Sequence, residues 1–220
     1  MPKKNYYLVI DTETANGLDE PLVYDIGFAV IDKKGNIYET FSYVVSDVFY
    51  GMRDVMQTAY YAEKIPRYEA DIAEGKRTVA SFLTIRKKIA EILNKYQITA
   101  VMAHNMRFDL NALNTTTRYL TKSRYRYFFP YKTQIWCTLA MAKSLIAKQK
   151  TYKIWCKERG YVQKNGTPRL TAEILHRFFT QDETFDESHT ALEDVLIEIW
   201  IFVRCMRQHK PMQRTYWKTA

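Results

Sequence analysis

Apolar residues gather in four short runs that predict buried strands. The runs are Tyr6–Ile10, Val23–Ile31, Ile37–Val45 and Ile98–Ala103. They are rich in the β-branched and aromatic residues that favour strands. Between the second and third runs, Asp32–Asn36 supplies turn residues, and Gly35 can adopt the positive φ that a hairpin turn requires. The pattern therefore predicts a hairpin early in the chain and one late strand.

Apolar residues at three- and four-residue spacing predict helices in six further segments. The segments are Asp54–Lys64, Val79–Lys95, Asp109–Leu120, Thr138–Lys148, Leu170–Phe179 and Ala191–Gln208. In the second segment, the apolar residues between Phe82 and Leu93 fall on one stripe, and Arg86–Lys88 lie on the opposite side. Strands joined by a hairpin and followed by helices predict an α/β fold, with a mixed sheet flanked by helices.

The composition indicates one globular domain. Of 220 residues, 47% are apolar, and 11 Phe, 17 Tyr and 4 Trp supply enough area for a full core. General disorder is therefore excluded. The sequence contains no repeat and no linker, and we predict a single domain over residues 1–208 followed by a basic tail over residues 209–220.

The chain carries no sequence signal for a membrane or for secretion. The longest apolar stretch, Val195–Val203, has nine residues and is interrupted by Glu198, whereas a bilayer span needs about 20 apolar residues. The first residues contain too short an apolar run for a signal peptide. Cys137, Cys156 and Cys205 are odd in number and widely spaced, which indicates reduced thiols. We expect a cytoplasmic protein.

The net charge of +9 is unevenly distributed along the chain. Between Leu110 and Leu170 there are 13 basic residues and a single acid, Glu158. Within this region, Arg118–Lys132 interleaves basic and aromatic side chains, a pattern that can hold phosphates and stack on unpaired bases. A segregated surplus of this kind predicts a surface for a polyanion. For the basic residues, the alternative is a solvated face without a ligand. For the aromatic residues, the alternative is that about half of the rings are buried in the core.

Two carboxylates follow the first predicted strand in the tripeptide Asp11-Thr12-Glu13. Residues two apart in an extended chain project to the same side, about 6.5–7 Å apart along the backbone. Both side chains can then reach one hard cation or a pair of cations. Acids this close repel one another unless a metal neutralises them. An exposed pair at a strand end is the alternative, and the tripeptide alone does not decide between the two.

Two later segments contain the other candidate chemical groups. His104–Asp109 follows the apolar run that ends at Ala103, and Asp109 can be read as a ligand or as a helix N-cap. In the same segment, His104 and Asn105 can be read as tethers of the loop backbone. His189 and Asp194 stand where a helix begins and can face one cavity if His189 precedes the first turn. The alternative places both of them on the surface.

Together and in this order, the three segments resemble the DnaQ-like 3′–5′ exonucleases with four acids and one histidine, the DEDDh family. The resemblance covers Tyr6 to Val203. Its motifs are Val9–Thr14, His104–Asp109 and His189–Asp194, the last being an H-x-x-x-x-D pattern. The resemblance implies a ribonuclease-H-like fold, an α/β fold with a five-stranded mixed sheet and helices on both faces. The chain looks most like the stand-alone, phage-type members, which implies the host cytoplasm if a phage encodes it.

The resemblance implies two divalent cations held by four carboxylates, with His189 as the general base. The carboxylates are Asp11, Glu13, Asp109 and Asp194. Because every ligand is a hard oxygen donor, Mg²⁺ or Mn²⁺ is favoured. Glu193 occupies a position that the family does not use for metal. The expected substrate contacts are Thr12, Thr14, Asn105, Phe108, Arg124 and Arg126.

The expected activity is 3′–5′ exonucleolytic hydrolysis of single-stranded or frayed DNA to 5′-mononucleotides. An exoribonuclease is the nearest alternative, because the choice rests on contacts to the 2′-OH. A polymerase-associated proofreading enzyme and a catalytically silent nucleic-acid-binding module also remain open. We expect single-stranded nucleic acid as partner, with DNA favoured over RNA, a possible polymerase or replication partner, and no membrane.

Two features depart from the family pattern: Ser46–Lys76, which is not typical of proofreading subunits, and Cys137–Thr138, where many relatives have an Asp before the Thr.

Overall fold

The strands form one mixed sheet of six strands in the order β4-β3-β2-β1-β5-β6. A computed structural model describes residues 4–17, 19–124 and 126–217 of the chain. The central pair β1–β2 and its neighbour β3 are antiparallel, whereas β5 and β6 on one side and β4 on the other add in parallel. The strands are β1 (Tyr6–Ala15), β2 (Leu22–Asp32), β3 (Ile37–Val45), β4 (Thr78–Ala80), β5 (Ala100–Ala103) and β6 (Ile135–Cys137).

The sheet separates two layers of apolar side chains because successive residues of a strand point to opposite faces. On β1, Leu8 and Ile10 pack into one layer, and Tyr7 and Val9 pack into the other. Strand β2 is buried along its whole length, which fits its near-continuous apolar sequence. Helices therefore have to cover both faces.

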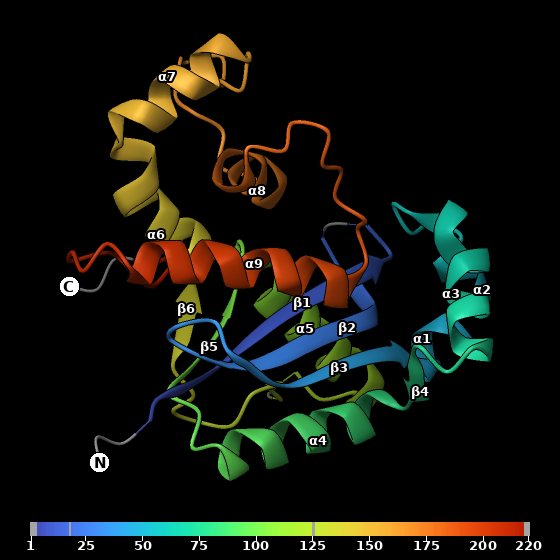
Figure 1. Cartoon of the computed structure of the whole chain (residues 1–220). Helices are drawn as coiled ribbons and strands as arrows, with labels where there is room; N and C mark the ends of the chain where they lie inside the picture. Colours follow the sequence, from blue (N-terminus) through green and yellow to red (C-terminus); the bar gives the residue numbers. More distant parts are fainter. Residues whose placement is uncertain (1–3, 18, 125, 218–220) are drawn as a thin grey trace.

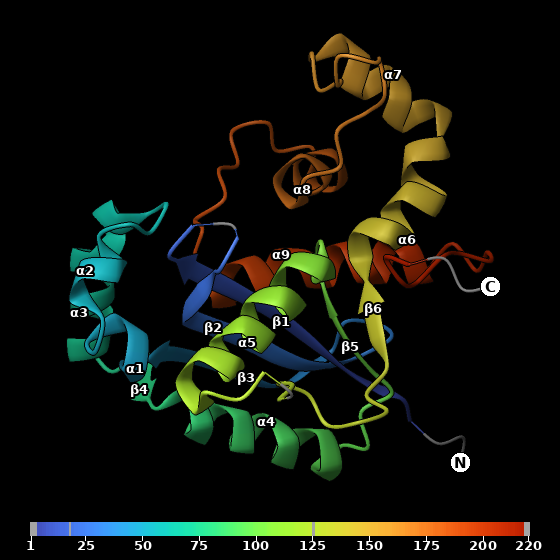
Figure 2. The same cartoon turned by 180° about the vertical axis from the view of Figure 1, so that it is seen from behind.

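The helices divide between these two faces. Figure 1 shows α9 lying across one face with α6, α7 and α8 beyond it, and Figure 2 shows α5 and α4 on the other face. The short helices α1, α2 and α3 gather beside the β3–β4 edge. The helices are α1 (Ser46–Phe49), α2 (Arg53–Met56), η1 (Ala62–Lys64), α3 (Ile65–Ala73), α4 (Phe82–Lys95), α5 (Met106–Thr121), α6 (Thr138–Leu145), η2 (Ile146–Lys148), α7 (Lys150–Glu158), α8 (Ala172–Thr180) and α9 (Ala191–Met206).

The expected α/β class and the hairpin between β2 and β3 are confirmed. Gly35 adopts φ +88° in the turn, and the carboxylate of Asp32 accepts hydrogen bonds from the backbone N–H groups of Lys34 and Asn36. Helix α4 begins where Ser81 accepts a hydrogen bond from the N–H of Thr84, an N-cap that satisfies one of the free donors of the first turn.

Two expectations about the elements were wrong. The sheet has six strands and not five, because the three residues of β4 pair with the outer edge of β3. The helix expected over Asp54–Lys64 is instead the short α2, a turn region and η1, followed by α3. In both places tertiary pairing overrides a weak local pattern, since a three-residue edge strand has almost no periodicity of its own.

The C-terminal segment folds back onto the domain. The N–H of Cys137 donates to the carbonyl of Arg214 at 2.6 Å, and the N–H of Gln213 donates to the hydroxyl of Ser144 at 3.1 Å. The guanidinium of Arg214 also lies over the ring of Trp136, 4.6 Å from its centre. Residues 213 and 214 are thus held against β6 and α6. Among the described residues, no helix is long and apolar enough to cross a membrane.

Candidate active site

Strand β1 carries Asp11 and Glu13 on the same side, as their spacing predicts. Contrary to the expectation that they follow a strand ending at Ile10, both acids lie within β1, which continues to Ala15. Pairing extends the strand, because Asp11 lies opposite Gly27 of β2 and Glu13 lies opposite Asp25. Both side chains are half-buried and not solvated as an exposed strand end would be.

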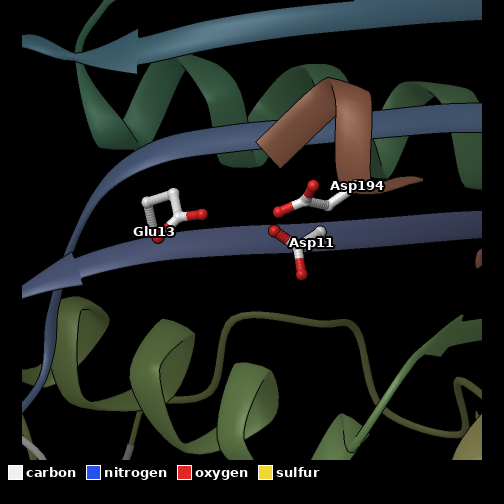
Figure 3. Close-up of side chains that lie close together, drawn as sticks. All are labelled: Asp11, Glu13 and Asp194. Carbon is white, nitrogen blue, oxygen red and sulfur yellow. The ribbon is translucent and has the colours of Figure 1, made fainter. Parts of the chain in front are cut away.

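Helix α9 brings Asp194 to these two acids. Ligand oxygens of Asp11, Glu13 and Asp194 all lie within 4.8 Å of one another, and Figure 3 shows the three carboxylates pointing toward one another from β1 and α9. The approach depends on Gly27, since a Cβ there would lie 2.2 Å from the backbone N of Leu192. A side chain at this position of β2 would therefore push the first turn of α9 away from Asp11.

Asp25, on β2, holds the first residue of α9 in place. Its Oδ2 accepts hydrogen bonds from the N–H of Ala191 at 3.1 Å and from the hydroxyl of Tyr68 at 2.7 Å. The same oxygen forms a buried salt bridge of 3.0 Å with Arg77. Tyr68 belongs to α3, so its hydrogen bond to Asp25 ties the 46–76 segment to the strand next to the acidic cluster.

Asp109 joins the site from the second motif. It lies in the first turn of α5 and is not its N-cap, a position held by Asn105 with φ +68°. Asp109 is buried, and its Oδ1 accepts a hydrogen bond of 2.9 Å from the hydroxyl of Thr12. The acid is thereby held beside β1 by Thr12, the residue between Asp11 and Glu13.

His189 lies in the loop that precedes α9 and is held by neighbours from the 46–76 segment. Its ring stacks on that of Tyr61, with centroids 4.5 Å apart and planes 13° from parallel. Nζ of Lys64 donates to the carbonyl of Ser188 at 2.7 Å, next to the histidine. His189 has φ +50°, a strained backbone conformation for a residue with a side chain, and these contacts hold it there. Nδ1 lies 3.9 Å from Oε2 of Glu187.

One open cavity of about 680 Å³ collects these groups. The predicted site residues that line it are Asp11, Thr12, Glu13, Asn105, Phe108, Asp109, His189 and Asp194. Thr14 and Arg126 are not among the described residues that line it, and Arg124 lines a separate cavity at the far end of α5. The structure therefore brings together all four acids and the histidine, but not all the expected substrate contacts.

The buried carboxyls resist ionisation. Burial, reinforced by the charge of Asp194, raises the pKa of Glu13 to about 9. Burial and the charge of Glu187 raise the pKa of Asp194 to about 8. Burial raises the pKa of Asp109 to about 7, although the hydrogen bond from Thr12 acts to lower it. For Asp11, burial and the charge of Asp109 raise the pKa well above its ordinary value. Crowded acids of this kind are stabilised by a cation.

The donor set fits a hard divalent cation. All the converging ligand atoms are carboxylate oxygens, which suit Mg²⁺, Ca²⁺ or Mn²⁺ and not the thiolate- and imidazole-seeking metals. Oδ1 of Asp194 is buried and has no hydrogen-bond partner among the described residues. An oxygen left unsatisfied in this position costs free energy that a bound cation would recover.

Comparison with known proteins bears on the fold. No family model matches the chain, and no curated protein matches its sequence. Among solved structures, the nuclease domain of 3′hExo, a DEDDh family member bound to rAMP, superposes with a TM-score of 0.57 at 11% identity over 97% of this chain and 98% of that one. The chain has the fold of a DEDDh 3′-exonuclease.

Two further structures with this DEDDh fold are similar to the chain. Exonuclease I of E. coli in complex with a 5cy-dT13 oligonucleotide has a TM-score of 0.54 at 13% identity over 93% of this chain. A 3′-exonuclease described for 3′-end specific recognition of a histone mRNA stem-loop has a TM-score of 0.53 at 13% identity over 96% of this chain. The chain spans 41% of the exonuclease I chain and 66% of the second chain.

The cavity contains two acids that the motifs did not predict, Glu187 and Glu198. Glu198 is 2% exposed, its Oε1 accepts a hydrogen bond of 2.7 Å from the N–H of His104, and its Oε2 has no partner among the described residues. Burial and the charge of Asp109 raise its pKa well above the ordinary value. The sequence signal was the single charge within the apolar run Val195–Val203.

Glu193 is directed away from the cluster. Its carboxylate accepts hydrogen bonds from the hydroxyl of Thr190 at 2.7 Å and from Arg67 at 2.9 Å. Burial opposes ionisation of Glu193, but hydrogen bonds from Ser188 and Thr190 lower its pKa below the ordinary value. Of the two adjacent acids on α9, Asp194 is thus the one within reach of Asp11 and Glu13.

Proposed function

We propose that the chain is a divalent-metal-dependent 3′–5′ exonuclease that hydrolyses single-stranded or frayed DNA to 5′-mononucleotides. The observation that carries the proposal is the convergence of Asp11, Glu13 and Asp194, whose ligand oxygens lie within 4.8 Å of one another. Asp11 and Asp194 are 183 residues apart in the sequence. Asp109 and His189 line the same cavity. The DEDDh fold, shared with proteins described as 3′-exonucleases, supports this proposal.

The four acids would hold two Mg²⁺ or Mn²⁺ ions. When bound, the ions supply Lewis-acid stabilisation of the charge that develops on the phosphate. Asp11 and Glu13 lie on β1 and Asp194 lies on α9, and Figure 3 shows the three side chains facing one another. Asp109, held by Thr12, completes the acidic wall of the cavity.

His189 is the proposed general base. Burial and the positive charge of Lys64 lower its pKa from the ordinary value, so the ring is neutral and able to accept a proton at neutral pH. Nδ1 faces Glu187, which leaves Nε2 to take the proton from the attacking water. The stacked ring of Tyr61 holds the imidazole in one orientation.

Basic and aromatic residues of the cavity would hold the terminal nucleotide. Lys143 and Arg169 line the cavity, and neither forms a salt bridge among the described residues, so both charges are free to face a phosphate. The half-buried ring of Phe108 and the amide of Asn105 are suited to a base and a sugar. A cavity of about 680 Å³ lies within the size range of small-molecule sites, which suits one or two nucleotides and not a duplex.

RNA is the second candidate substrate. Two of the similar structures are described with rAMP and with a histone mRNA stem-loop, whereas exonuclease I is described with an oligonucleotide of dT. The selective element would be a contact to the 2′-OH. We favour DNA and treat matched RNA as the direct competitor in the test.

The proposal is tested with one oligonucleotide labelled at either end. With Mg²⁺ or Mn²⁺, the 3′ label should be released first as a mononucleotide, and the 5′-labelled strand should shorten one residue at a time. EDTA should stop both reactions, and a matched RNA strand should be degraded more slowly. If the 3′ label stays on the strand and the 5′-labelled strand keeps its length in both Mg²⁺ and Mn²⁺, the proposal is overturned in favour of a binding module. Faster loss of the RNA would reassign the substrate.

A further inference from the structure

Two smaller cavities adjoin the proposed active site and continue away from it. They have volumes of about 490 and 450 Å³. The first shares Asn105 and Phe108 with the cavity of the acids, and the second shares Asn105, Leu139 and Lys143 with it. Because the three cavities have these lining residues in common, they lie next to one another. We call the two smaller cavities the distal groove.

The charged residues that line the distal groove are basic, whereas the active-site cavity next to it contains the acidic cluster. Arg107, Lys143 and Lys148 line it, and among the described lining residues there is no carboxylate. All three cations are exposed, and none pairs with an acid in the described part of the chain. Unpaired cations in a groove without acids attract a polyanion.

The distal groove has an aromatic side chain where its two cavities meet. Tyr216, which is 38% exposed, lines both of them together with Arg107. The segment that carries Tyr216 is anchored, since Arg214 and Gln213 bind Cys137 and Ser144 through the backbone hydrogen bonds described above. The side-chain amide of Gln213 also donates to the carbonyls of Thr215 and Trp217, which fixes the backbone on either side of the ring.

We propose that the distal groove binds the single strand upstream of the nucleotide being removed, with phosphates on Arg107, Lys143 and Lys148 and a base stacked on Tyr216. The inference rests on the proposed function and extends it, because it gives the C-terminal segment a part in substrate binding. Exposed rings and basic side chains in alternation are the usual features of sites for single-stranded nucleic acid.

The groove is a better candidate than the basic stretch that the sequence indicated. Arg124 lies in a cavity that also contains Asp19 and Glu20, so its charge is opposed locally. Among the described lining residues, that cavity shares only Asn111 with the distal groove. In the distal groove, by contrast, the cations face no acid among the described lining residues.

Binding of fluorescein-labelled dT12 and dT3, measured by anisotropy in EDTA, tests the inference without requiring catalysis. Tyr216→Ala should weaken binding of dT12 by about 5- to 150-fold, the range expected for losing one stacked base, and Tyr216→Phe should restore it. Binding of dT3, which extends by only about one nucleotide beyond the active-site cavity, should change much less than binding of dT12. Arg107→Ala should lower the slope of log affinity against log salt by about 0.7.

A matched control is Tyr131→Ala, because Tyr131 is 92% exposed and is not among the described residues lining the distal groove. Hydrolysis of the p-nitrophenyl ester of thymidine 5′-monophosphate in Mn²⁺ reports the active site separately and should be the same in Tyr216→Ala and wild type. If the ester is cleaved but Tyr216→Ala binds dT12 normally, the groove inference is wrong. If the ester is not cleaved but dT12 binding is lost, the groove stands and the proposed function fails. Equal competition by a poly-glutamate peptide would also contradict the inference, since it would show a general anion site.

Discussion

Removing divalent cations should make the stability of this protein fall as the pH rises. The pKa values of Asp109, Asp194 and Glu13 are raised to about 7, 8 and 9, so the folded protein keeps protons that the unfolded chain has released above about pH 4. The stabilisation that the protonated groups provide is complete below pH 4 and is lost as the pH rises to about 9.

The size of the effect follows from the same values. Ionising Asp194 in the folded state, with a pKa of about 8 against an ordinary value of 3.8, costs on the order of 5 kcal/mol. At pH 7 the three groups together hold about two protons. A cation that binds the ionised oxygens displaces those protons, so its stabilising effect grows with pH.

Two measurements check this linkage. Thermal unfolding in EDTA should give a Tm that decreases from pH 5 to pH 9, while 10 mM Mg²⁺ should raise the Tm more at pH 8 than at pH 6. Calorimetric titration with Mn²⁺ at pH 7, in two buffers of different ionisation enthalpy, should show release of at least about two protons, because Asp11, whose pKa is also raised, adds to the protons held by the other three acids. Asp194→Asn, which cannot ionise, should raise the Tm in EDTA at pH 9, where the wild-type carboxyl is charged, and should weaken the response to metal.

The reasoning would be refuted by a Tm in EDTA that is flat or rises over this pH range. It would equally be refuted if cation binding released no protons, because the carboxyls would then be ionised before the metal arrives. Asp54→Asn, on the short helix α2 and outside the cavity, serves as a charge control and should leave the pH profile unchanged.

Three further variants test how the site is built. His189→Gln should lower kcat by about 10²- to 10⁴-fold while Mn²⁺ binding, measured by calorimetry, stays the same; unchanged turnover would remove the base assignment. Tyr61→Ala should lower kcat by about 10- to 100-fold with little change in KM, and Tyr61→Phe should restore it because the stacked ring is kept. Gly27→Ala should lower the free energy of unfolding by at least about 2 kcal/mol and weaken metal affinity, since the added Cβ would meet the backbone of α9 at 2.2 Å; a variant as stable as wild type would contradict that packing.

Much of the fold is readable from local pattern. Strand β3 has the bounds Ile37–Val45 that its β-branched and aromatic residues predict, and α4 ends at Lys95 as its apolar stripe predicts. Short elements were not readable. Strand β6 has three residues, Ile135–Cys137, and exists because they pair in parallel with β5. Such pairing depends on residues distant in sequence, so local periodicity does not reveal it.

The site divides in the same way. The three motifs identified Asp11 and Glu13 on β1, Asp109 on α5, His189 before α9 and Asp194 on α9, but not Glu187 in the same loop as His189. Tyr61 was missed, because its role depends on the fold bringing the 46–76 segment against His189. Glu198 was visible only as one charge in an apolar run, and nothing local showed that the backbone of His104 would be its partner.

The central claim is that Asp11 and Asp194, from opposite ends of the chain, act as one metal site that cuts nucleic acid. The most direct measurement combines two readouts on Asp11→Asn and Asp194→Asn: shortening of a 5′-labelled oligonucleotide in Mg²⁺, and Mn²⁺ binding by calorimetry. Each variant should lose both cleavage and at least one bound ion while remaining folded. Cleavage at the wild-type rate by either variant, or loss of cleavage with Mn²⁺ binding intact in both, would contradict the claim.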